Sequence, residues 1–295
     1  MEITFLGTSG MQPTRERNLS AVLLSYNNEN ILIDCGEGTQ RQFKFADLKA
    51  TRVTKILISH LHGDHILGLP GFLQNLEVNN YSGKLKIYGP KGIKDFIEFI
   101  RKLGVFNKLK YEITEIKEGI ICSEKTFLIK AHKLDHYGIC YGFEFIEKDR
   151  RKINLDYLKK FDLKQHPILK NLQQGRSIVW KNKKIDVNKA TNLISGKKIG
   201  FISDTKLCAN CYKIGKNADL LISEATFIDE LKEKAKEYRH LTAKQAAEIA
   251  KKSKAKKLVL NHFSQRYKDE NIILKEAKIV FKNTECAKDF MKIRI

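Results

Sequence analysis

Long hydrophobic runs are absent from this sequence of 295 residues, and proline is scarce, with 4 residues. The apolar runs are short pieces such as Ile56 to Ile58 and Leu258 to Leu260, whereas a membrane-spanning helix needs about 18 apolar residues in succession. We therefore expect a soluble protein with no membrane partner. The composition, with 42% hydrophobic residues and 18 Gly, also excludes collagen, low-complexity and wholly disordered chains, and it supplies enough apolar material for a core.

Cysteine is sparse as well. Six cysteines are scattered along the chain, too few for a disulfide framework at this length. Only Cys208 and Cys211 have the spacing of metal ligands, and because a structural zinc site usually needs a second such pair, the sequence favours two incidental thiols in a turn. The first residues, Met1 to Gly7, lack the features of a secretory signal. We therefore expect a cytoplasmic protein whose cysteines are thiols.

Positive charge is in excess: 55 Lys and Arg against 34 Asp and Glu give a net charge of +21. Such an excess fits a nucleic-acid-binding protein, a protein that adheres to anionic membranes, or a chain with a lysine-rich background. Its distribution helps to choose among them. Residues 148–184 hold 12 Lys and Arg against 3 Asp, which is +9 of the total. A background would be spread evenly, so this concentration indicates a binding surface.

Short apolar strands alternate with polar turns and helical stretches along most of the chain. The segment from about residue 146 to 195 breaks the pattern with dense charge and the single Trp180, so we interpret it as an arm inserted at about 148–195 into one domain of residues 1–295. The expected strands are Ile3 to Leu6, Ala21 to Leu24, Ile31 to Ile33, Lys55 to Ser59, Leu85 to Tyr88, Phe127 to Ala131, Tyr141 to Phe145, Lys198 to Ser203, Leu220 to Ser223 and Lys257 to Leu260. The expected helices are Ile66 to Glu77, Lys91 to Leu103, Leu155 to Leu163 within the arm, and Thr242 to Ser253 with Thr242 as its cap.

Four potential metal ligands lie within six positions directly after an expected strand, at His60, His62, Asp64 and His65. A lone histidine is usually structural, but here four polar groups that each need a partner are crowded together. Imidazole and carboxylate suit zinc and neighbouring first-row metals. In an extended loop alternate side chains point the same way, so His60 and His62 are expected to hold one metal ion, and Asp64 and His65 a second.

Two metal ions need more ligands than this loop offers, and further candidates follow other expected strands. These are His136, Asp204 and His262, each placed where a rigid sheet would carry a functional residue on a loop. The carboxylate of Asp204 is the natural bridge because its two oxygens can serve two cations. The seven ligands leave open positions for water and substrate.

Several motifs carry a resemblance to a known family. His60, His62, Asp64 and His65 match the His-x-His-x-Asp-His signature of metallo-β-lactamase-fold hydrolases, which glyoxalase II, lactonases and arylsulfatases share. Within that group the chain resembles the ribonuclease Z family of tRNA 3′-processing endonucleases nearly from end to end. The motifs that carry the narrower resemblance are Phe5 to Gly10 with Pro13, Thr14, Arg17 and Asn18, Asp34 to Gln40, Ser223 to Phe227, and Asn261 to Tyr267.

The resemblance implies an α/β fold, the αββα sandwich of two mixed sheets flanked by helices, with a protruding basic arm that grips tRNA. It also implies two zinc ions per chain, precursor tRNA as substrate, and a homodimer in which the arm of one subunit serves the active site of the other. Asp64 would hold and deprotonate the attacking water, and His240 would protonate the leaving oxygen. The chain departs from the family pattern at Leu241, between His240 and Thr242, and at His166, before Pro167.

Two other functions stay open at this point. One is a small-molecule hydrolase or phosphodiesterase of the same fold, which would not need a basic arm. The other is a zinc-containing RNA-binding protein without catalysis, although structural zinc sites are normally closed by four protein ligands. Among lesser candidates, His132 is expected to be structural, Glu224 to orient a ligand histidine, Tyr157 and Trp180 to pack within the arm rather than stack on RNA, and His166 to take no part in catalysis.

Overall fold

The computed structural model describes residues 1–295, and the chain divides into two compact units. The first unit consists of residues 1–122, 129–145 and 198–295, and the second of residues 123–128 and 146–197. The first unit contains two large hydrophobic clusters, and the second has a small cluster of its own.

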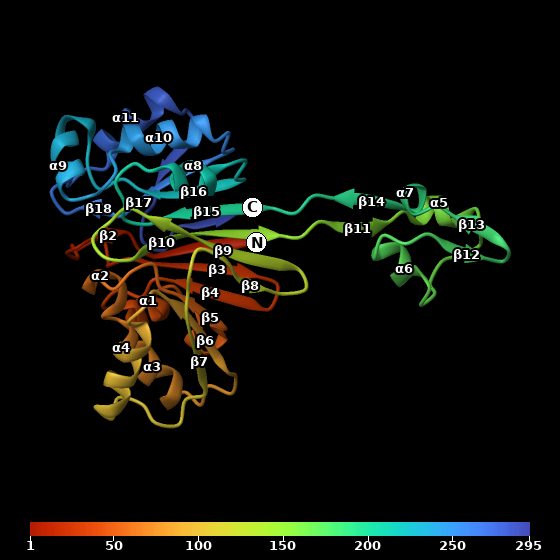
Figure 1. Cartoon of the computed structure of the whole chain (residues 1–295), viewed down its shortest axis with the longest axis horizontal. Helices are drawn as coiled ribbons and strands as arrows, with labels where there is room; N and C mark the ends of the chain where they lie inside the picture. Colours follow the sequence, from red (N-terminus) through yellow and green to blue (C-terminus); the bar gives the residue numbers. More distant parts are fainter. The chain divides into compact units, whose positions relative to one another are not determined.

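Two seven-stranded sheets form the centre of the first unit (Figure 1). The first sheet is mixed, since Glu2–Gly7 pairs antiparallel with Ala21–Tyr26 and Glu29–Ile33 pairs parallel with Lys55–Leu57. In the second sheet Lys198–Ile202 pairs parallel with Leu220–Glu224, which pairs parallel with Leu258–Asn261. In order across the first sheet the strands are β20 (Lys292–Arg294), β1 (Glu2–Gly7), β3 (Ala21–Tyr26), β4 (Glu29–Ile33), β5 (Lys55–Leu57), β6 (Leu85–Gly89) and β7 (Tyr111–Glu115). Across the second sheet they are β19 (Thr284–Cys286), β17 (Leu258–Asn261), β16 (Leu220–Glu224), β15 (Lys198–Ile202), β10 (Cys140–Glu147), β9 (Phe127–Leu134) and β8 (Gly119–Ser123). A short parallel pair, β2 (Ser9–Gly10) and β18 (Phe263–Ser264), stands apart from both.

Helices cover the outer faces of the two sheets. Figure 1 shows α3 and α4 beside the first sheet and α10 and α11 beside the second. The α-helices of this unit are α1 (Thr39–Phe45), α2 (Gly63–Ile66), α3 (Leu69–Val78), α4 (Ile93–Lys102), α8 (Ala209–Gly215), α9 (Lys232–Glu237), α10 (Ala243–Lys252) and α11 (Asn271–Val280), and 3₁₀ turns span Ala50–Arg52 and Asp229–Leu231. None of these helices is long and apolar enough to cross a bilayer.

Apolar side chains fill the three interfaces between the helices and the sheets. Leu24 and Ile31 of the first sheet and Phe143 and Phe201 of the second line one shared apolar space, so the inner faces of the sheets pack on each other. One outer cluster joins α1, α3 and α4 to the first sheet, and another joins α8, α10 and α11 to the second. The layers therefore run helix, sheet, sheet, helix, and the αββα sandwich expected from the sequence is confirmed.

The expected strands of the core are confirmed, whereas one expected helix is interrupted. In place of a single helix over residues 66–77, α2 ends at Ile66 and α3 begins at Leu69. Gly68 explains the break, because its N–H donates to the Cys35 carbonyl at 2.9 Å and a Cβ there would lie 2.0 Å from the Gly36 carbonyl oxygen. Thr242 caps α10 as predicted, accepting from the Gln245 N–H in a capping box, an arrangement that stabilises a helix by about 1 kcal/mol.

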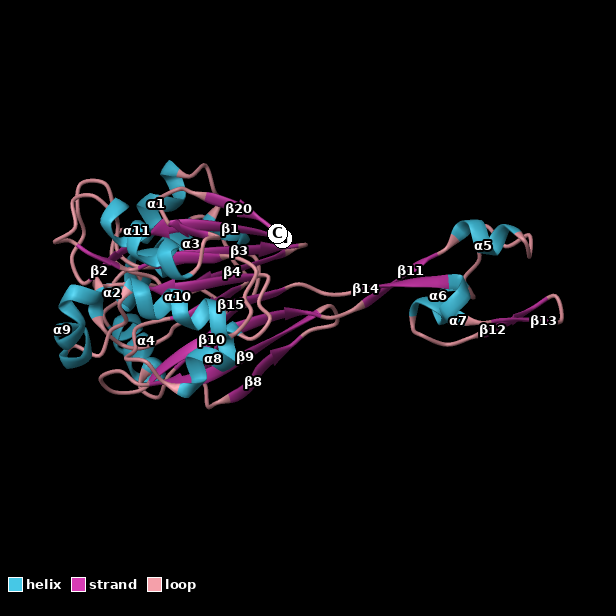
Figure 2. Cartoon of the chain, turned by 90° about the horizontal axis from the view of Figure 1, so that it is seen from above, coloured by secondary structure: helices cyan, strands magenta, loops and turns pink.

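The second unit is small and mostly polar on its surface. A two-stranded sheet, a hairpin and three short helices surround one cluster of apolar side chains (Figure 2). The elements are β11 (Arg150–Ile153), which pairs with β14 (Thr191–Ile194), the hairpin β12 (Ile178–Trp180) and β13 (Lys183–Ile185), and α5 (Leu155–Lys159), α6 (Leu169–Gln173) and α7 (Val187–Ala190). The helix expected over Leu155 to Leu163 is therefore shorter, and it ends at Lys159.

The basic residues of this unit face solvent, while its aromatic residues pack inward. Of the 12 Lys and Arg within residues 148–184, all but Lys148 and Arg151 are exposed. Tyr157 and Trp180 are half-buried against the apolar cluster around Leu158, which supports packing rather than base stacking as their role.

Candidate metal centre

Polar side chains follow the ends of strands from both sheets and meet at one place. The cluster His60 to His65 follows β5, His136 follows β9, Asp204 follows β15, and His262 follows β17. All seven candidate ligands are brought together. The local backbone differs from the expected extended loop, because Asp64 and His65 lie in the short helix α2.

The seven side chains form two groups that share Asp204. The groups are His60, His62, His136 and Asp204, and Asp64, His65, Asp204 and His262, with the ligand atoms of each group within 4.8 Å of one another. Asp204 Oδ2 lies 3.7 Å from His60 Nε2 and 3.4 Å from His65 Nε2, and Asp204 Oδ1 lies 3.4 Å from His262 Nε2. Ligand atoms around a tetrahedral zinc ion lie about 3.4 Å apart, so these spacings suit metal coordination.

The unpaired atoms of the cluster provide an independent test of that fit. His60 Nε2, His65 Nε2 and Asp204 Oδ1 are buried and form no hydrogen bond, although buried polar atoms almost always have a partner. Burial alone would lower the pKa of His65, but the carboxylates of Asp204 and Asp64 outweigh it and raise that pKa well above its usual range. Burial, by contrast, holds the pKa of His60 well below its usual range, so its ring is neutral. A cluster that offers carboxylates, a neutral imidazole and buried nitrogen and oxygen atoms without a hydrogen bond fits metal cations.

Asp34 holds the first loop in place. It belongs to the family motif Asp34 to Gln40, but no role at the centre was predicted for it from the sequence. It is fully buried, and its Oδ2 lies 2.8 Å from His65 Nδ1. It also accepts from the Ser59 N–H at 2.7 Å and the Ser59 hydroxyl at 2.9 Å, and Ser59 Oγ lies 2.9 Å from His60 Nδ1. A carboxylate behind a ligand histidine fixes the orientation of the ring. The sequence signals were the position of Asp34 directly after a strand, like Asp204, and its place in the motif Asp34 to Gln40.

Replacing Asp34 by alanine is expected to lower zinc affinity about 10-fold to 100-fold, because His65 Nδ1 and the Ser59 N–H lose their partner. Competition with a chromogenic chelator measures the affinity. Replacing Ser25, a hydroxyl of β3 that pairs with Asn30, by alanine is the matched control and should leave it unchanged. Equal zinc affinity in the Asp34 variant and the control would contradict this role.

The ring of His240 lies beside the ligand groups, with its centroid 5.1 Å from that of His136 and 5.5 Å from that of His262. Its Nδ1 lies 3.1 Å from Glu224 Oε1. Burial by itself would lower the pKa of His240, but the charge and hydrogen bond of Glu224 outweigh it and raise that pKa to about 9. The Glu224 carboxylate therefore favours the protonated form of His240.

Glu224 reaches a ligand histidine through Thr226. The Thr226 hydroxyl lies 2.7 Å from Glu224 Oε2 and 2.9 Å from His262 Nδ1, and the Thr205 N–H donates to Glu224 Oε1 at 2.7 Å. Glu224 thus positions both His240 and His262, in agreement with the role expected for it.

The loop after β2 closes one side of the centre. A Cβ on Gly10 would lie 2.5 Å from the His262 ring, so only glycine fits there, and the Met11 N–H donates to Asp64 Oδ2 at 2.8 Å. His262 itself has a positive φ of 59°, a conformation that costs energy and often occurs at functional sites. His62 is the exposed member of the set, so the centre opens to solvent on its side.

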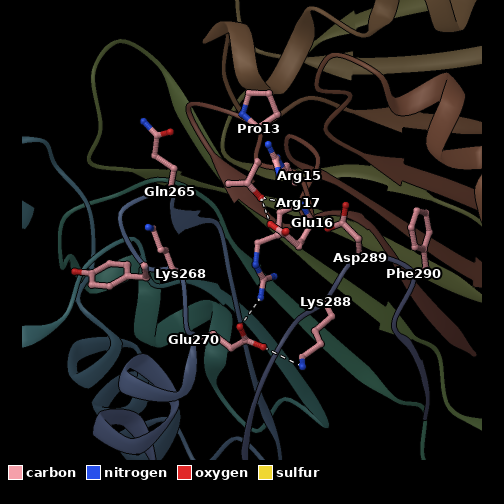
Figure 3. Close-up of a pocket in the computed structure, with 12 residues that line it drawn as sticks. Pro13, Arg15, Glu16, Arg17, Gln265, Lys268, Glu270, Lys288, Asp289 and Phe290 are labelled. Atoms are coloured by element: carbon pink, nitrogen blue, oxygen red, sulfur yellow. Dashed lines mark hydrogen bonds and ion pairs between the residues drawn. The ribbon is translucent and has the colours of Figure 1, made fainter.

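A cavity of about 820 Å³ lies next to this loop, lined by residues 13–17, 288–290, Gln265, Tyr267, Lys268 and Glu270 (Figure 3). Glu270 joins two basic side chains across it, with its carboxylate 3.3 Å from Arg17 Nη2 and 3.0 Å from Lys288 Nζ. Four basic and three acidic residues line the cavity, so its charge is nearly compensated. We therefore assign the reactive chemistry to the His and Asp cluster and not to this cavity.

The remaining histidines lie outside the centre. His132 Nε2 lies 3.0 Å from Glu144 Oε2, and Lys198 also pairs with Glu144, so His132 has the structural role expected for it. The ring of His166, in the second unit, packs 4.7 Å from that of Trp180.

The fold and the cluster together define a metallo-β-lactamase-fold hydrolase. The chain is similar to the metallo-β-lactamase fold protein YhfI of Bacillus subtilis, with a TM-score of 0.72 and 20% identity over 99% of this chain and 98% of that one. A family profile described as anti-Pycsar protein Apyc1 matches residues 1–115.

Two further comparisons identify the family. Ribonuclease Z of Bacillus mycoides is 39% identical over 98% of this chain and 97% of its own length. The short form of human tRNase Z is 32% identical, with a TM-score of 0.74 over 100% of this chain and 99% of that one. The chain belongs to the ribonuclease Z family.

Proposed function

We propose that this protein is a zinc-dependent endoribonuclease that removes the 3′ trailer from precursor tRNA. It hydrolyses a phosphodiester and leaves a 3′-hydroxyl on the tRNA and a phosphate on the trailer. The observation that carries this proposal is the pair of ligand groups that share Asp204, in a chain similar to ribonuclease Z over nearly its whole length. Two bound zinc ions would polarise the phosphodiester and acidify the attacking water.

Asp64 and His240 are the residues that we propose move protons. Asp64 lies between His65 and His262, with its Oδ2 3.3 Å from the Nε2 atom of each. Burial alone would raise the pKa of Asp64, but these histidines outweigh it and hold the pKa well below its usual range. Asp64 is therefore ionised, and its carboxylate can accept a hydrogen bond from the attacking water. We propose on the family resemblance, and not on this pKa, that it also receives the proton of the water. His240, protonated at neutral pH, donates a proton to the leaving oxygen.

The role of His240 predicts a loss of activity at high pH. A raised pKa of about 9 means that the protonated form is present below that pH and is lost above it, so cleavage should decline as pH rises through about 9. In Glu224→Gln the main charge that stabilises the proton is gone, and the decline should begin at lower pH. Single-turnover cleavage measured across pH at fixed zinc concentration tests this.

Two variants control that experiment. His240→Ala should lower the rate about 10²-fold to 10⁴-fold and remove the decline, and Glu248→Gln, a change on the surface of α10, should leave the profile unchanged. A decline at the same pH in Glu224→Gln as in the unaltered protein would contradict the proposed proton donor.

We propose that the second unit is the substrate-binding arm inserted into a single catalytic domain. Its exposed lysines and arginines, with +9 in residues 148–184, suit the phosphate backbone of tRNA. We further propose a cytoplasmic homodimer in which the arm of one subunit binds tRNA for the active site of the other.

A 3′-extended precursor tRNA tests the overall proposal. We expect one cut that releases the trailer, loss of that cut in excess chelator, and its return when zinc is added. Elemental analysis should find two zinc ions per chain. Cleavage that persists in chelator, or zinc bound without any cleavage, would count against the proposal, and the second result would favour a non-catalytic RNA-binding protein.

A further inference from the structure

Two cysteines outside the metal centre lie in contact. Cys208 precedes α8, Cys211 lies in its first turn, and their Sγ atoms are 3.5 Å apart. A disulfide needs about 2.05 Å between the sulfurs, so a shift of roughly 1.5 Å would join them. The expectation of two incidental thiols is not tested by this contact, but the contact places the two sulfurs within reach of each other.

Access to the two sulfurs differs. Cys208 is half-buried and lines a cavity of about 530 Å³, together with Lys133, Asn210 and Arg239. Cys211 is fully buried. A dissolved reagent can therefore meet Cys208, whereas Cys211 can meet only Cys208. This is the arrangement of an attacking thiol and a resolving thiol.

The surroundings of the pair also favour reaction at Cys208. The hydrogen bond between Cys211 Sγ and Cys208 Sγ, in which either thiol can be the donor, outweighs the effect of burial and lowers the pKa of Cys208 to about 6. The pKa of Cys211 is raised well above its usual range by the same contact and by burial. Burial likewise raises the pKa of Cys286, to about 12. Since the thiolate is the nucleophile, Cys208 is the thiol selected for attack.

We propose that Cys208 and Cys211 form a thiol–disulfide exchange site that reacts with low-molecular-weight disulfides such as oxidised glutathione. The Cys208 thiolate attacks one sulfur of the small disulfide, whose S–S bond breaks and releases one thiolate. Cys211 then gives up its proton to water and attacks the Cys208 sulfur, which displaces the second thiolate, and the released thiolates take up protons from water. The dithiol loses two electrons, and the small disulfide gains them and becomes two thiols.

Peptide mapping of the full chain tests this site. The protein is incubated with oxidised glutathione without air, alkylated and digested with trypsin, which cuts after Lys206 and Lys213 and releases both cysteines in one peptide, Leu207 to Lys213. We expect that peptide to be lighter by two hydrogens than its reduced form and to resist alkylation. Free thiols should fall from six to four. A peptide that stays fully reduced and alkylated would overturn the proposal.

Three variants assign the roles. Cys211→Ser should stop at a mixed disulfide of glutathione on Cys208, and Cys208→Ser should leave Cys211 unmodified. Cys286→Ser, a matched change at a buried cysteine remote in sequence, should form the Cys208–Cys211 disulfide as the unaltered protein does. Glutathione attached to Cys211 in Cys208→Ser would contradict the assignment of Cys208 as the attacking thiol. Circular dichroism of each variant shows that it has folded.

Discussion

Replacing Asp64 by alanine is expected to lower the rate of precursor-tRNA cleavage at least ~10³-fold while tRNA binding is retained. The change removes the carboxylate that lies 3.3 Å from both His65 Nε2 and His262 Nε2 and that accepts from the Met11 N–H. The water thus loses its proton acceptor, and the second ligand group loses a member. Rapid-quench cleavage and filter binding of the same precursor measure the two effects separately.

Metal content distinguishes the two causes of this loss. In Asp64→Asn an oxygen remains at the same position but the proton acceptor is gone, so we expect zinc to be largely retained and the rate still to fall at least ~10²-fold. Asp95→Ala, which removes an exposed carboxylate from α4, is the matched control. Cleavage at the unaltered rate in Asp64→Ala would show that the proposed mechanism is wrong.

The ligand set could be predicted because both the ends of strands and clusters of metal-binding residue types can be recognised in a sequence. Three histidines and an aspartate within six positions have no simple structural explanation, and His136, Asp204 and His262 each follow an apolar strand. The strands themselves could be predicted because short apolar runs between polar turns are a local sequence signal for a buried strand. The structure brings these residues together as expected, and their roles as ligands are part of the proposed function.

The supporting contacts could not be predicted because they join residues that are distant along the chain. Asp34 meets Ser59 and His65, 25 and 31 positions away, and Thr226 meets His262, 36 positions away. No local pattern encodes such a pairing. The break between α2 and α3 arises in the same way, since it depends on how closely Gly68 approaches the Gly36 carbonyl. The reactivity proposed for Cys208 likewise depends on a difference that the sequence does not show, since Cys208 is half-buried and Cys211 fully buried.

Removing the second unit is expected to abolish processing of precursor tRNA while leaving the hydrolysis of a small chromogenic phosphodiester intact. The ladder between β11 and β14 allows a defined deletion, because Arg150 pairs with Ile194. Residues 150–194 can be replaced by Asn-Gly, a dipeptide that closes a two-residue hairpin, between Asp149 and Ser195. The apolar cluster of the unit around Leu158 and Leu172 is deleted whole, so no part of it is left exposed.

The expected effect on tRNA follows from charge. The deletion removes eleven exposed Lys and Arg, and leaving several phosphates without a cationic partner weakens binding by about 10³-fold or more at moderate salt. A small phosphodiester does not depend on these cations, and its turnover depends on the His and Asp cluster. Equal loss of both activities would show that residues 150–194 are needed for the catalytic centre, and equal retention of both would favour a small-molecule phosphodiesterase.

Charge substitutions separate electrostatic binding from the shape of the arm. Lys164, Lys170 and Lys184 are exposed residues of the second unit, and Lys251, Lys252 and Lys254 are matched exposed lysines at the end of α10. Changing the first three to Gln should weaken tRNA binding. In a plot of the logarithm of the binding constant against the logarithm of the salt concentration, the slope should become shallower by about one for each phosphate that is no longer neutralised. Changing the second three should have little effect. Affinity for tRNA that does not depend on salt would show that the basic residues of this unit are not the binding surface.

A mixing experiment then tests whether the arm acts within one subunit or across a dimer. Asp64→Ala has an arm but no proton acceptor, and the deletion variant has an intact centre but no arm, so neither should process precursor tRNA alone. If the arm of one subunit serves the centre of the other, mixed dimers combine a working arm with a working centre, and cleavage should return to a measurable fraction of the unaltered rate. If the arm serves its own subunit, every chain in the mixture lacks one of the two parts, and cleavage should stay absent.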